Sequence, residues 1–266
     1  MEPEYKTIYE FDDNLIYDYF VNLERQGPGS PEMTIKALSF IDKLNENSYI
    51  ADIGCGTGGQ TLVLAKHTTG SIIGIDSSPT FIDKFKYNVN KNNFQNRIKG
   101  IVESMDNLSF KKEELDMIWS EGAIYNIGFE RGLKEWNQYI KPNGYIAVTD
   151  ASWYTEDRPA EITDFWKVYP EMDTIPNNVM KMQKAGYIPI ASFILPEICW
   201  TENYYAPQVS LQKNFLKKYA GNKDVEDFIF SERWERQLYE KYKEYYGYVF
   251  YIGKKISLLD VCPNSA

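Results

Sequence analysis

Histidine is almost missing from this sequence, which has a single one, His67, in 266 residues. Because histidine is the side chain that most often moves protons near neutral pH, its scarcity disfavours a histidine-based mechanism. His67 ends a helical pattern on the side away from the strand carboxyl ends, so we expect a surface residue that interacts with the helix dipole. Any general base would be a carboxylate or a tyrosine.

Cysteine is also scarce, and long apolar runs are missing. The three cysteines, Cys55, Cys199 and Cys262, are irregularly spaced, so neither a disulfide framework nor a zinc site is predicted, and no metal is expected. No apolar run approaches the roughly 18 residues of a membrane span, and no signal peptide is recognisable. We therefore expect a cytoplasmic protein without a membrane partner.

Basic residues are outnumbered, because 29 Lys and Arg face 38 Asp and Glu, and the formal net charge is −9. Phosphate recognition needs a basic face, so a nucleic-acid partner is not expected. Hydrophobic residues make up 43% of the chain, which is enough for a sizeable core. The length predicts one large domain, or one domain with a cap.

Glycine, in contrast, is concentrated in residues 49–60, which read YIADIGCGTGGQ. A short apolar run precedes the glycines and a helical pattern follows them, so a strand, a tight loop and a helix are predicted. Glycine permits positive φ and lets a ligand approach the backbone closely. Gly54, Gly56 and Gly59 fit the spacing of a nucleotide-binding loop, which a dinucleotide enzyme would share.

Two acids near this loop narrow the choice of ligand. Asp76 ends the next apolar run, about 20 residues beyond the loop, where nucleotide-binding folds place a carboxylate on the ribose hydroxyls. Asp52 immediately precedes Ile53 and the first glycine. A carboxylate at this place would repel a pyrophosphate and would suit a cationic ligand.

The segment Asp52–Gly59, DIGCGTGG, followed by Gly74-Ile75-Asp76, resembles motifs I and II of the class I S-adenosylmethionine-dependent methyltransferases. The resemblance is strongest over residues 48–150. It implies S-adenosylmethionine as the cofactor and methyl transfer to a small-molecule acceptor as the reaction. The cofactor-binding residues that we expect are Asp52, Gly54, Cys55, Gly56, Gly58, Asp76, Ser77, Met105, Asp106 and Glu121, together with Arg25 and Ser30 from an N-terminal flap.

Strand and helix patterns alternate through the chain. Alternation of this kind predicts a doubly wound, mostly parallel α/β sheet with helices on both faces. The resemblance implies a Rossmann-like sheet of seven strands whose last strand is antiparallel, and Pro189 predicts an edge or a bulge. The strands are expected at about 49–53, 71–76, 97–103, 115–119, 145–150, 187–195 and 248–253.

Ligands of such sheets bind at the carboxyl ends of the strands. Glu121 and Tyr125 are the residues that we select as catalytic, and Asp150 is a third candidate base nearby. In relatives with the sequence GDAxxLPF after the third strand, the aspartate of this motif binds the amino group of adenine. Ser104 stands at the position of that aspartate here, so we expect Asp106 to take its place. Met105 would lie against the adenine ring. An acidic residue lies at the carboxyl end of each of five predicted strands. These residues are Asp52, Asp76, those within Glu103 to Asp106, Glu121 and Asp150.

The remaining segments are expected to cover the site. We predict an N-terminal helical lid at 1–45, the cofactor-binding core at 46–196, a helical cap at 197–246, the last strand at 247–256 and a frayed tail at 257–266. The segment through Ser30, the loop at 152–172 and two helices within 207–246 carry aromatic residues that would close over the acceptor. The Lys and Glu residues of those helices are most simply a solvated face. Alternatively, the helices pad the sheet or form a homodimer contact.

Two other function classes stay open. An NAD-dependent oxidoreductase is disfavoured by Asp52 and by the lack of a catalytic histidine. A module that binds S-adenosylmethionine without turnover has no distinguishing sequence feature. The aromatic lid and the acidic composition favour a compact acceptor that is aromatic or cationic.

Overall fold

The structure is a computed structural model that describes residues 3–257. Its centre is a twisted sheet with the strand order β3-β2-β1-β4-β5-β8-β7, and the short strand β6 pairs with β5. The predicted tail at 257–266 lies outside the described residues except for Ser257. The strands are β1 (Tyr49–Ile53), β2 (Ser71–Asp76), β3 (Ile98–Val102), β4 (Leu115–Ser120), β5 (Ile140–Trp153), β6 (Asp173–Thr174), β7 (Tyr187–Ile194) and β8 (Tyr246–Lys255).

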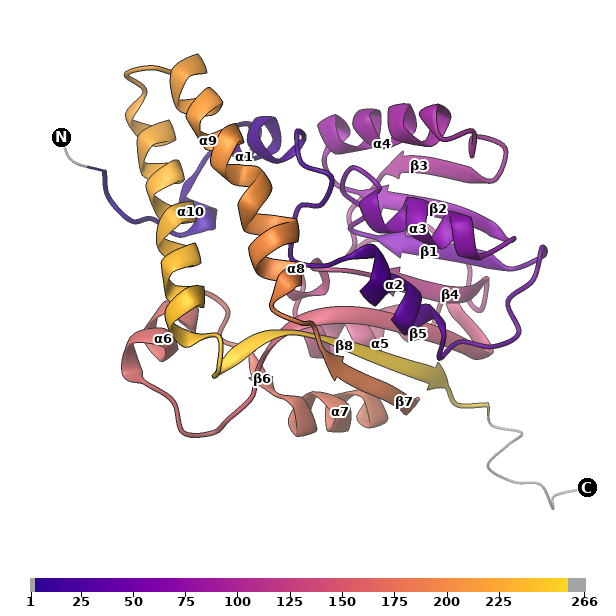
Figure 1. Ribbon diagram of the computed structural model, residues 1–266. Helices are drawn as coiled ribbons and strands as arrows, with labels where there is room; N and C mark the ends of the chain where they lie inside the picture. Colours follow the sequence, from indigo (N-terminus) through magenta and orange to yellow (C-terminus); the bar gives the residue numbers. More distant parts are fainter. Residues whose placement is uncertain (1–2, 258–266) are drawn as a thin grey trace, which may run out of the picture.

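Helices cover both faces of this sheet (Figure 1). The alternation of side chains along β1 explains the two layers, because Ile50 packs in one core with Leu64, while Ala51 and Ile53 pack in the other with Leu133. The helices are α1 (Asp13–Phe20), α2 (Pro31–Leu38), α3 (Gly59–His67), α4 (Pro79–Lys91), α5 (Phe129–Asn137), α6 (Ala160–Phe165), α7 (Ile175–Lys184), α8 (Ile198–Trp200), α9 (Ala206–Lys218) and α10 (Lys223–Tyr242), with a π-helical turn at Thr201–Tyr205.

The predicted fold is confirmed, including its antiparallel end. Strands β1 to β5 run parallel, and β8 lies antiparallel between β5 and β7. Strand β7 ends the sheet, and its register shifts between Pro189 and Ala191, so Pro189 marks both an edge and a bulge, as a residue without an N–H requires. Within residues 3–257, no helix combines the length and the apolarity needed to cross a membrane.

Several helix boundaries follow from capping chemistry. The Ser30 hydroxyl accepts from the backbone N–H of Met33 at the start of α2 (3.2 Å), and the Ser78 hydroxyl accepts from that of Phe81 at the start of α4 (3.3 Å). Each cap is followed by a proline at the first helical position. Gly186 ends α7 with φ +88°.

Two expectations about local structure were wrong. The strand expected at about 145–150 is longer, because β5 begins at Ile140 and runs to Trp153, paired with β8 along most of its length. The loop expected at 152–172 contains α6 and a 3-10 turn.

The helical cap stands at the carboxyl edge of the parallel strands. Figure 1 shows α9 and α10 beside one another at this edge, with the N-terminal segment and α1 next to them. Tyr19 of α1 packs edge-on against Phe215 of α9 and Phe228 of α10, with ring centroids 5.2 and 5.1 Å apart. The start of the chain and its last third therefore enclose the strand ends together.

Candidate active site

The glycine loop lies where β1 and β2 end. The backbone N–H groups of Gly54 and Cys55 both donate to the Ile75 carbonyl oxygen, at 2.8 and 2.9 Å. Gly54 has φ +71° and Gly56 has φ +53°, a conformation that residues with a Cβ rarely adopt. The loop thus turns sharply beside the end of β2, and its backbone faces the space above the sheet.

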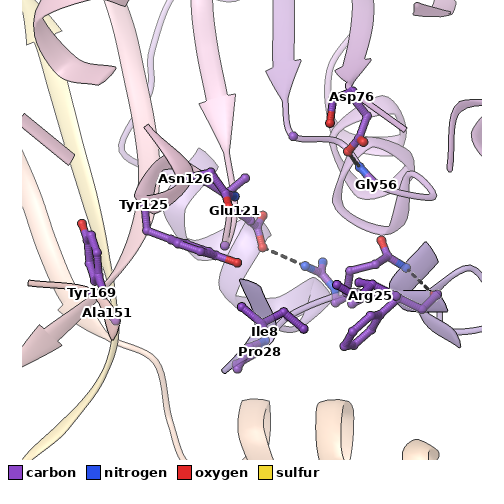
Figure 2. A pocket seen from close by; sticks show the side chains of 18 of the residues that line it. Ile8, Arg25, Pro28, Gly56, Asp76, Glu121, Tyr125, Asn126, Ala151 and Tyr169 are labelled. Carbon is purple, nitrogen blue, oxygen red and sulfur yellow. Dashed lines mark hydrogen bonds and ion pairs between the residues drawn. The ribbon is translucent and has the colours of Figure 1, made fainter. Parts of the chain in front are cut away.

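Asp76 is held at the rim of this loop (Figure 2). Its Oδ2 accepts from the Gly56 N–H and its Oδ1 from the Ser78 N–H, each at 2.9 Å. Burial raises the pKa of Asp76, and the two backbone bonds oppose that rise. Each oxygen keeps a second lone pair, so the carboxylate can still accept two hydroxyl hydrogen bonds from a ligand.

The N-terminal segment is fastened to the glycine loop by Gln26. The Gln26 Oε1 accepts from the Thr57 N–H (3.0 Å), and its Nε2 donates to the Leu23 carbonyl oxygen (3.0 Å). A Cβ added to Gly56 would come within 2.1 Å of the Gln26 Oε1. Glycine at 56 therefore makes room for a residue of the lid, a role that the sequence did not indicate.

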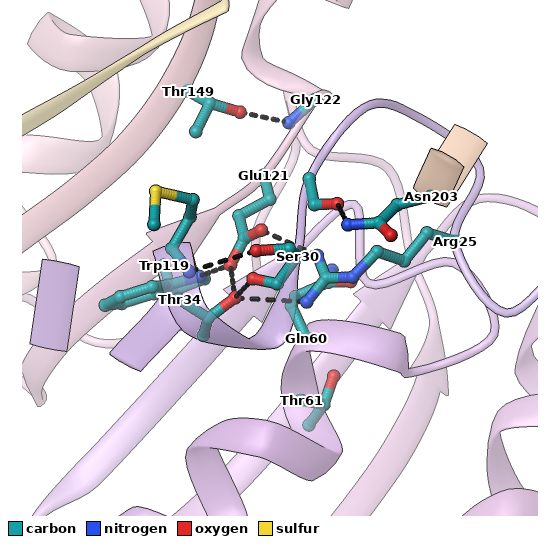
Figure 3. A network of polar contacts seen from close by, with 12 residues as sticks. Arg25, Ser30, Thr34, Gln60, Thr61, Trp119, Glu121, Gly122, Thr149 and Asn203 are labelled. Carbon is teal, nitrogen blue, oxygen red and sulfur yellow. Dashed lines mark hydrogen bonds and ion pairs between the residues drawn. The ribbon is translucent and has the colours of Figure 1, made fainter. Parts of the chain in front are cut away.

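Arg25 and Glu121 form an ion pair inside the protein (Figure 3). The Arg25 Nη1 lies 2.7 Å from the Glu121 Oε2, and the two side chains are 9% and 4% exposed. The Glu121 Oε1 also accepts from the Thr34 hydroxyl (2.7 Å) and from the Trp119 indole N–H (2.9 Å). Both carboxylate oxygens of Glu121 are thus engaged by Arg25, Thr34 and Trp119, and this geometry indicates that Glu121 positions the N-terminal segment.

These groups border one cavity of about 600 Å³ that extends from the glycine loop to the helical cap. Figure 2 shows Tyr125 between Glu121 and Tyr169 on its wall. Most residues expected at the site line it. They are Gly54, Cys55, Gly56, Asp76, Ser77, Met105, Asp106, Glu121, Tyr125 and Arg25.

Three of the expected site residues do not line the cavity. Asp52 is fully buried beneath the loop, where it accepts from the Thr61 hydroxyl and from the Gln60 amide, and burial raises its pKa to about 7. Gly58 begins α3 with φ +92° and faces a ring of α4. Ser30 is used as the cap of α2. Asp52 and Gly58 therefore shape the glycine loop from behind, whereas Ser30 shapes the start of α2.

Tyr125 and Asp150, the other two candidates for a catalytic group, differ in their position relative to the cavity. Tyr125 lines the cavity, and burial raises the pKa of its phenol, so this hydroxyl stays protonated and can donate. Asp150 does not line the cavity. It accepts from the Tyr169 hydroxyl (3.1 Å), and burial raises its pKa to about 8. His67 is exposed at the end of α3, and its Nδ1 lies 2.9 Å from the Val63 carbonyl oxygen.

Sequence reasoning missed the acids that the cap contributes. Glu232 and Glu235 of α10 both line the cavity, and Glu232 is only 9% exposed. The expectation of a solvated face was wrong for this side of α10. The three-residue spacing of the two glutamates, on a helix whose apolar residues Phe228, Ile229 and Leu238 are buried, was the available signal.

Comparison with known proteins agrees with this site. Residues 50–144 match a family model described as a methyltransferase domain. This part of the chain is a methyltransferase domain. The match begins in β1 and ends in β5, so it contains the glycine loop, Asp76 and Glu121. The predicted class I family is confirmed for this domain, while the lid and the cap lie outside the match.

Relatives of the methyltransferase domain act on different acceptors. The chain is 31% identical over 140 residues to phosphoethanolamine N-methyltransferase of Plasmodium falciparum, covering 51% of this chain and 50% of that protein. It is 26% identical over 176 residues to 2-methyl-6-phytyl-1,4-hydroquinone methyltransferase 1 of Oryza sativa, covering 65% and 50%. The chain thus spans about half the length of these curated relatives.

The solved structure of a methyltransferase from Geobacter sulfurreducens in complex with S-adenosylhomocysteine resembles the whole fold. It has a TM-score of 0.79 and 16% identity, and the likeness covers 92% of this chain and 98% of that one. A methyltransferase from Thiobacillus denitrificans gives a TM-score of 0.77 at 17% identity, covering 95% and 100%. The likeness shows that the shared fold extends well beyond residues 50–144.

Proposed function

We propose that this protein is an S-adenosylmethionine-dependent methyltransferase that acts on a small-molecule acceptor. The observation that carries the proposal is the Asp76 carboxylate, fixed by the N–H groups of Gly56 and Ser78 at the rim of a cavity with acidic walls. This is a site for a nucleoside that carries positive charge and no phosphate.

The residues present fit this cofactor. The free lone pairs of Asp76 suit the two ribose hydroxyls, and Met105 offers an apolar surface to the base. The Glu103 Oε2 is buried without a hydrogen-bond partner, while its Oε1 accepts from the Ser109 N–H. An unsatisfied carboxylate oxygen beside Met105 suits the amino group of adenine, in place of the Asp106 that the sequence favoured.

The protein's contribution to the reaction is placement and exclusion of water. When bound, the sulfonium supplies an electrophilic methyl group, which the acceptor's lone pair takes as the C–S electron pair stays on sulfur. The rings of Tyr125 and Tyr169 border the space beyond Glu121 and hold the acceptor away from bulk solvent. The Tyr125 hydroxyl, kept protonated by burial, can donate a hydrogen bond that orients the acceptor.

A dinucleotide cofactor fits less well. A diphosphate at the glycine loop would lie near the carboxylates of Asp76, Glu103 and Asp106, and the guanidinium of Arg25 is already paired with Glu121. The same charges argue against phosphoethanolamine, the acceptor named for the Plasmodium relative, because its phosphate would have no free cation among the described lining residues.

Calorimetry tests the cofactor directly. S-adenosylmethionine and S-adenosylhomocysteine are expected to bind, and NAD is not. Release of labelled methyl groups into a metabolite extract then separates an enzyme from a module that only binds the cofactor. Tight NAD binding without a response to S-adenosylhomocysteine would overturn the proposal, and cofactor binding without any transfer would favour the module.

We also propose a cytoplasmic location. Cys55 and Cys199 are both buried free thiols, the state that thiols keep in a reducing compartment. Cell fractionation tests this, and recovery from a secreted or organellar fraction would contradict it.

We further propose that the chain forms a homodimer through β7. This strand ends the sheet and exposes the large apolar side chains of Ile188, Ile190 and Ile194. Sedimentation analysis should show a dimer that Ile190→Lys converts to a monomer, and a monomeric wild type would refute the proposal.

A further inference from the structure

The part of the cavity beyond the cofactor region is bounded by α10 and by aromatic rings. Glu232 and Glu235 are three residues apart on one face of this helix, and both line the cavity. The aromatic residues that line the same cavity from the N-terminal segment, the 3-10 turn Ile124–Asn126, the 160–172 segment, the cap and β8 are Tyr5, Tyr9, Tyr17, Phe20, Tyr125, Phe165, Trp166, Tyr169, Trp200, Tyr204 and Tyr248.

The two carboxylates lack the partners that buried charges need. Glu232 is 9% exposed and forms no hydrogen bond or ion pair with any residue in the described range 3–257. Within the same range, Glu235 accepts only from the Tyr205 hydroxyl, at 3.3 Å. Burial raises the pKa of both, and the charge of Glu235 raises that of Glu232 further. Glu235 is half-buried beside the buried Glu232. Two desolvated carboxylates without a counter-ion are costly, and a bound cation would offset that cost.

Charge along the whole cavity has one predominant sign. Among the described lining residues the single cationic side chain is that of Arg25, which Glu121 neutralises. An anionic ligand would therefore meet repulsion throughout. The acidic lining residues are Asp13, Asp76, Glu103, Asp106, Glu121, Glu232 and Glu235.

We propose that the methyl acceptor carries an ammonium or another cationic nitrogen and no phosphate or carboxylate group, and that Glu232 and Glu235 bind this cation among the aromatic rings of the cap. Aromatic faces attract a desolvated cation through their quadrupoles, and Trp200 and Tyr204 line the same cavity. The carboxylates supply charge recognition, while the rings exclude water. This inference rests on the proposed function, because it assigns the second half of the same cavity.

The test uses the full-length protein saturated with S-adenosylhomocysteine. Calorimetry compares n-butylammonium, 2-phenylethylammonium and tetramethylammonium with the anions butyrate and 3-phenylpropionate. At least one ammonium probe is expected to bind at least tenfold more tightly than both anions. The double variant Glu232→Gln/Glu235→Gln should lose at least tenfold of that affinity, while Glu226→Gln, a charge removal on α10 outside the cavity lining, should not.

Glutamine keeps the shape of glutamate, and unchanged affinity for S-adenosylhomocysteine shows that each variant is folded. If no ammonium probe is preferred over the anions by the wild type, or if the double variant binds the probes as the wild type does, this inference is wrong. Absence of S-adenosylhomocysteine binding to the wild type would instead refute the proposed function. The single variants Glu232→Gln and Glu235→Gln provide the same comparison should the double variant not fold.

Discussion

Removing one member of the Arg25–Glu121 pair should destabilise the protein strongly. Both side chains are almost fully buried, at 9% and 4% exposure. Arg25→Met would leave the Glu121 carboxylate with Thr34 and Trp119 but without a counter-charge. Breaking a buried pair in this way costs about 3–5 kcal/mol of the free energy of unfolding. Glu121→Gln would instead leave the buried guanidinium of Arg25 without a counter-charge, and a similar loss of the free energy of unfolding is expected.

The double variant Arg25→Met/Glu121→Gln should be less damaged than the two single effects combined. With both charges gone no unpaired charge remains, so the coupling free energy should be about 2 kcal/mol. Urea unfolding of the four proteins measures it. Arg131→Met and Glu135→Gln form the matched control, because their pair is exposed at 50% and 41% and should contribute under about 1 kcal/mol.

The same pair also fastens the lid, and this gives a second measurement. Arg25 lies in the loop before α2, whereas Glu121 follows β4. The single variants should therefore bind S-adenosylhomocysteine more weakly and exchange amide hydrogens faster in residues 20–30. If the single effects add up without coupling, or if Arg25→Met is as stable as the exposed control, the ion pair does not hold the lid.

Four further results are expected. Asp76→Ala should weaken cofactor binding by about 1.5–3 kcal/mol in calorimetry, because hydrogen bonds to a charged group are lost. His67→Ala should keep turnover within a few-fold, because His67 is exposed at the end of α3, away from the cavity. Burial raises the pKa of Asp52 from 3.8 to about 7 in the folded protein. As the pH rises, Asp52 therefore loses its proton in the unfolded chain before it does so in the folded protein. Its contribution to the free energy of unfolding should then fall as the pH rises from about 4 to about 7, and Asp52→Asn should flatten that slope in urea titrations. Hydrogen exchange with S-adenosylhomocysteine and an acceptor should slow most in residues 25–30 and 152–172.

The sheet and the glycine loop could be predicted from sequence because local rules decide them. Apolar runs separated by helical patterns predicted the positions of the strands along the chain, and the spacing of the glycines between one such run and a helical pattern predicted the loop. The direction of Asp52 could not be predicted, because strand alternation allows either face until the packing of Thr61 against it is known. Its carboxylate consequently shapes the loop from beneath.

The inner face of the cap was missed for a different reason. Helix α10 carries many charged residues, and its weak amphipathicity resembles that of a solvated helix. Its burial results from contacts with segments more than 200 residues away: Lys6 pairs with Asp227 (3.1 Å), and Tyr19 packs on Phe228. Such contacts bring Glu232 inside, and the three-residue spacing of Glu232 and Glu235 is a weak local sign of this arrangement.

The connections of the N-terminal segment explain how the two halves of the cavity depend on each other. Gln26 holds the segment to the glycine loop, while the Gly29 N–H donates to the Cys199 carbonyl oxygen (3.4 Å) and the Gly29 carbonyl oxygen accepts from the Asn203 side chain (3.1 Å). One short loop therefore contacts both the glycine loop and the first turns of the cap. A variant that detaches this loop from the glycine loop should therefore also loosen the part of the cavity that Trp200 lines.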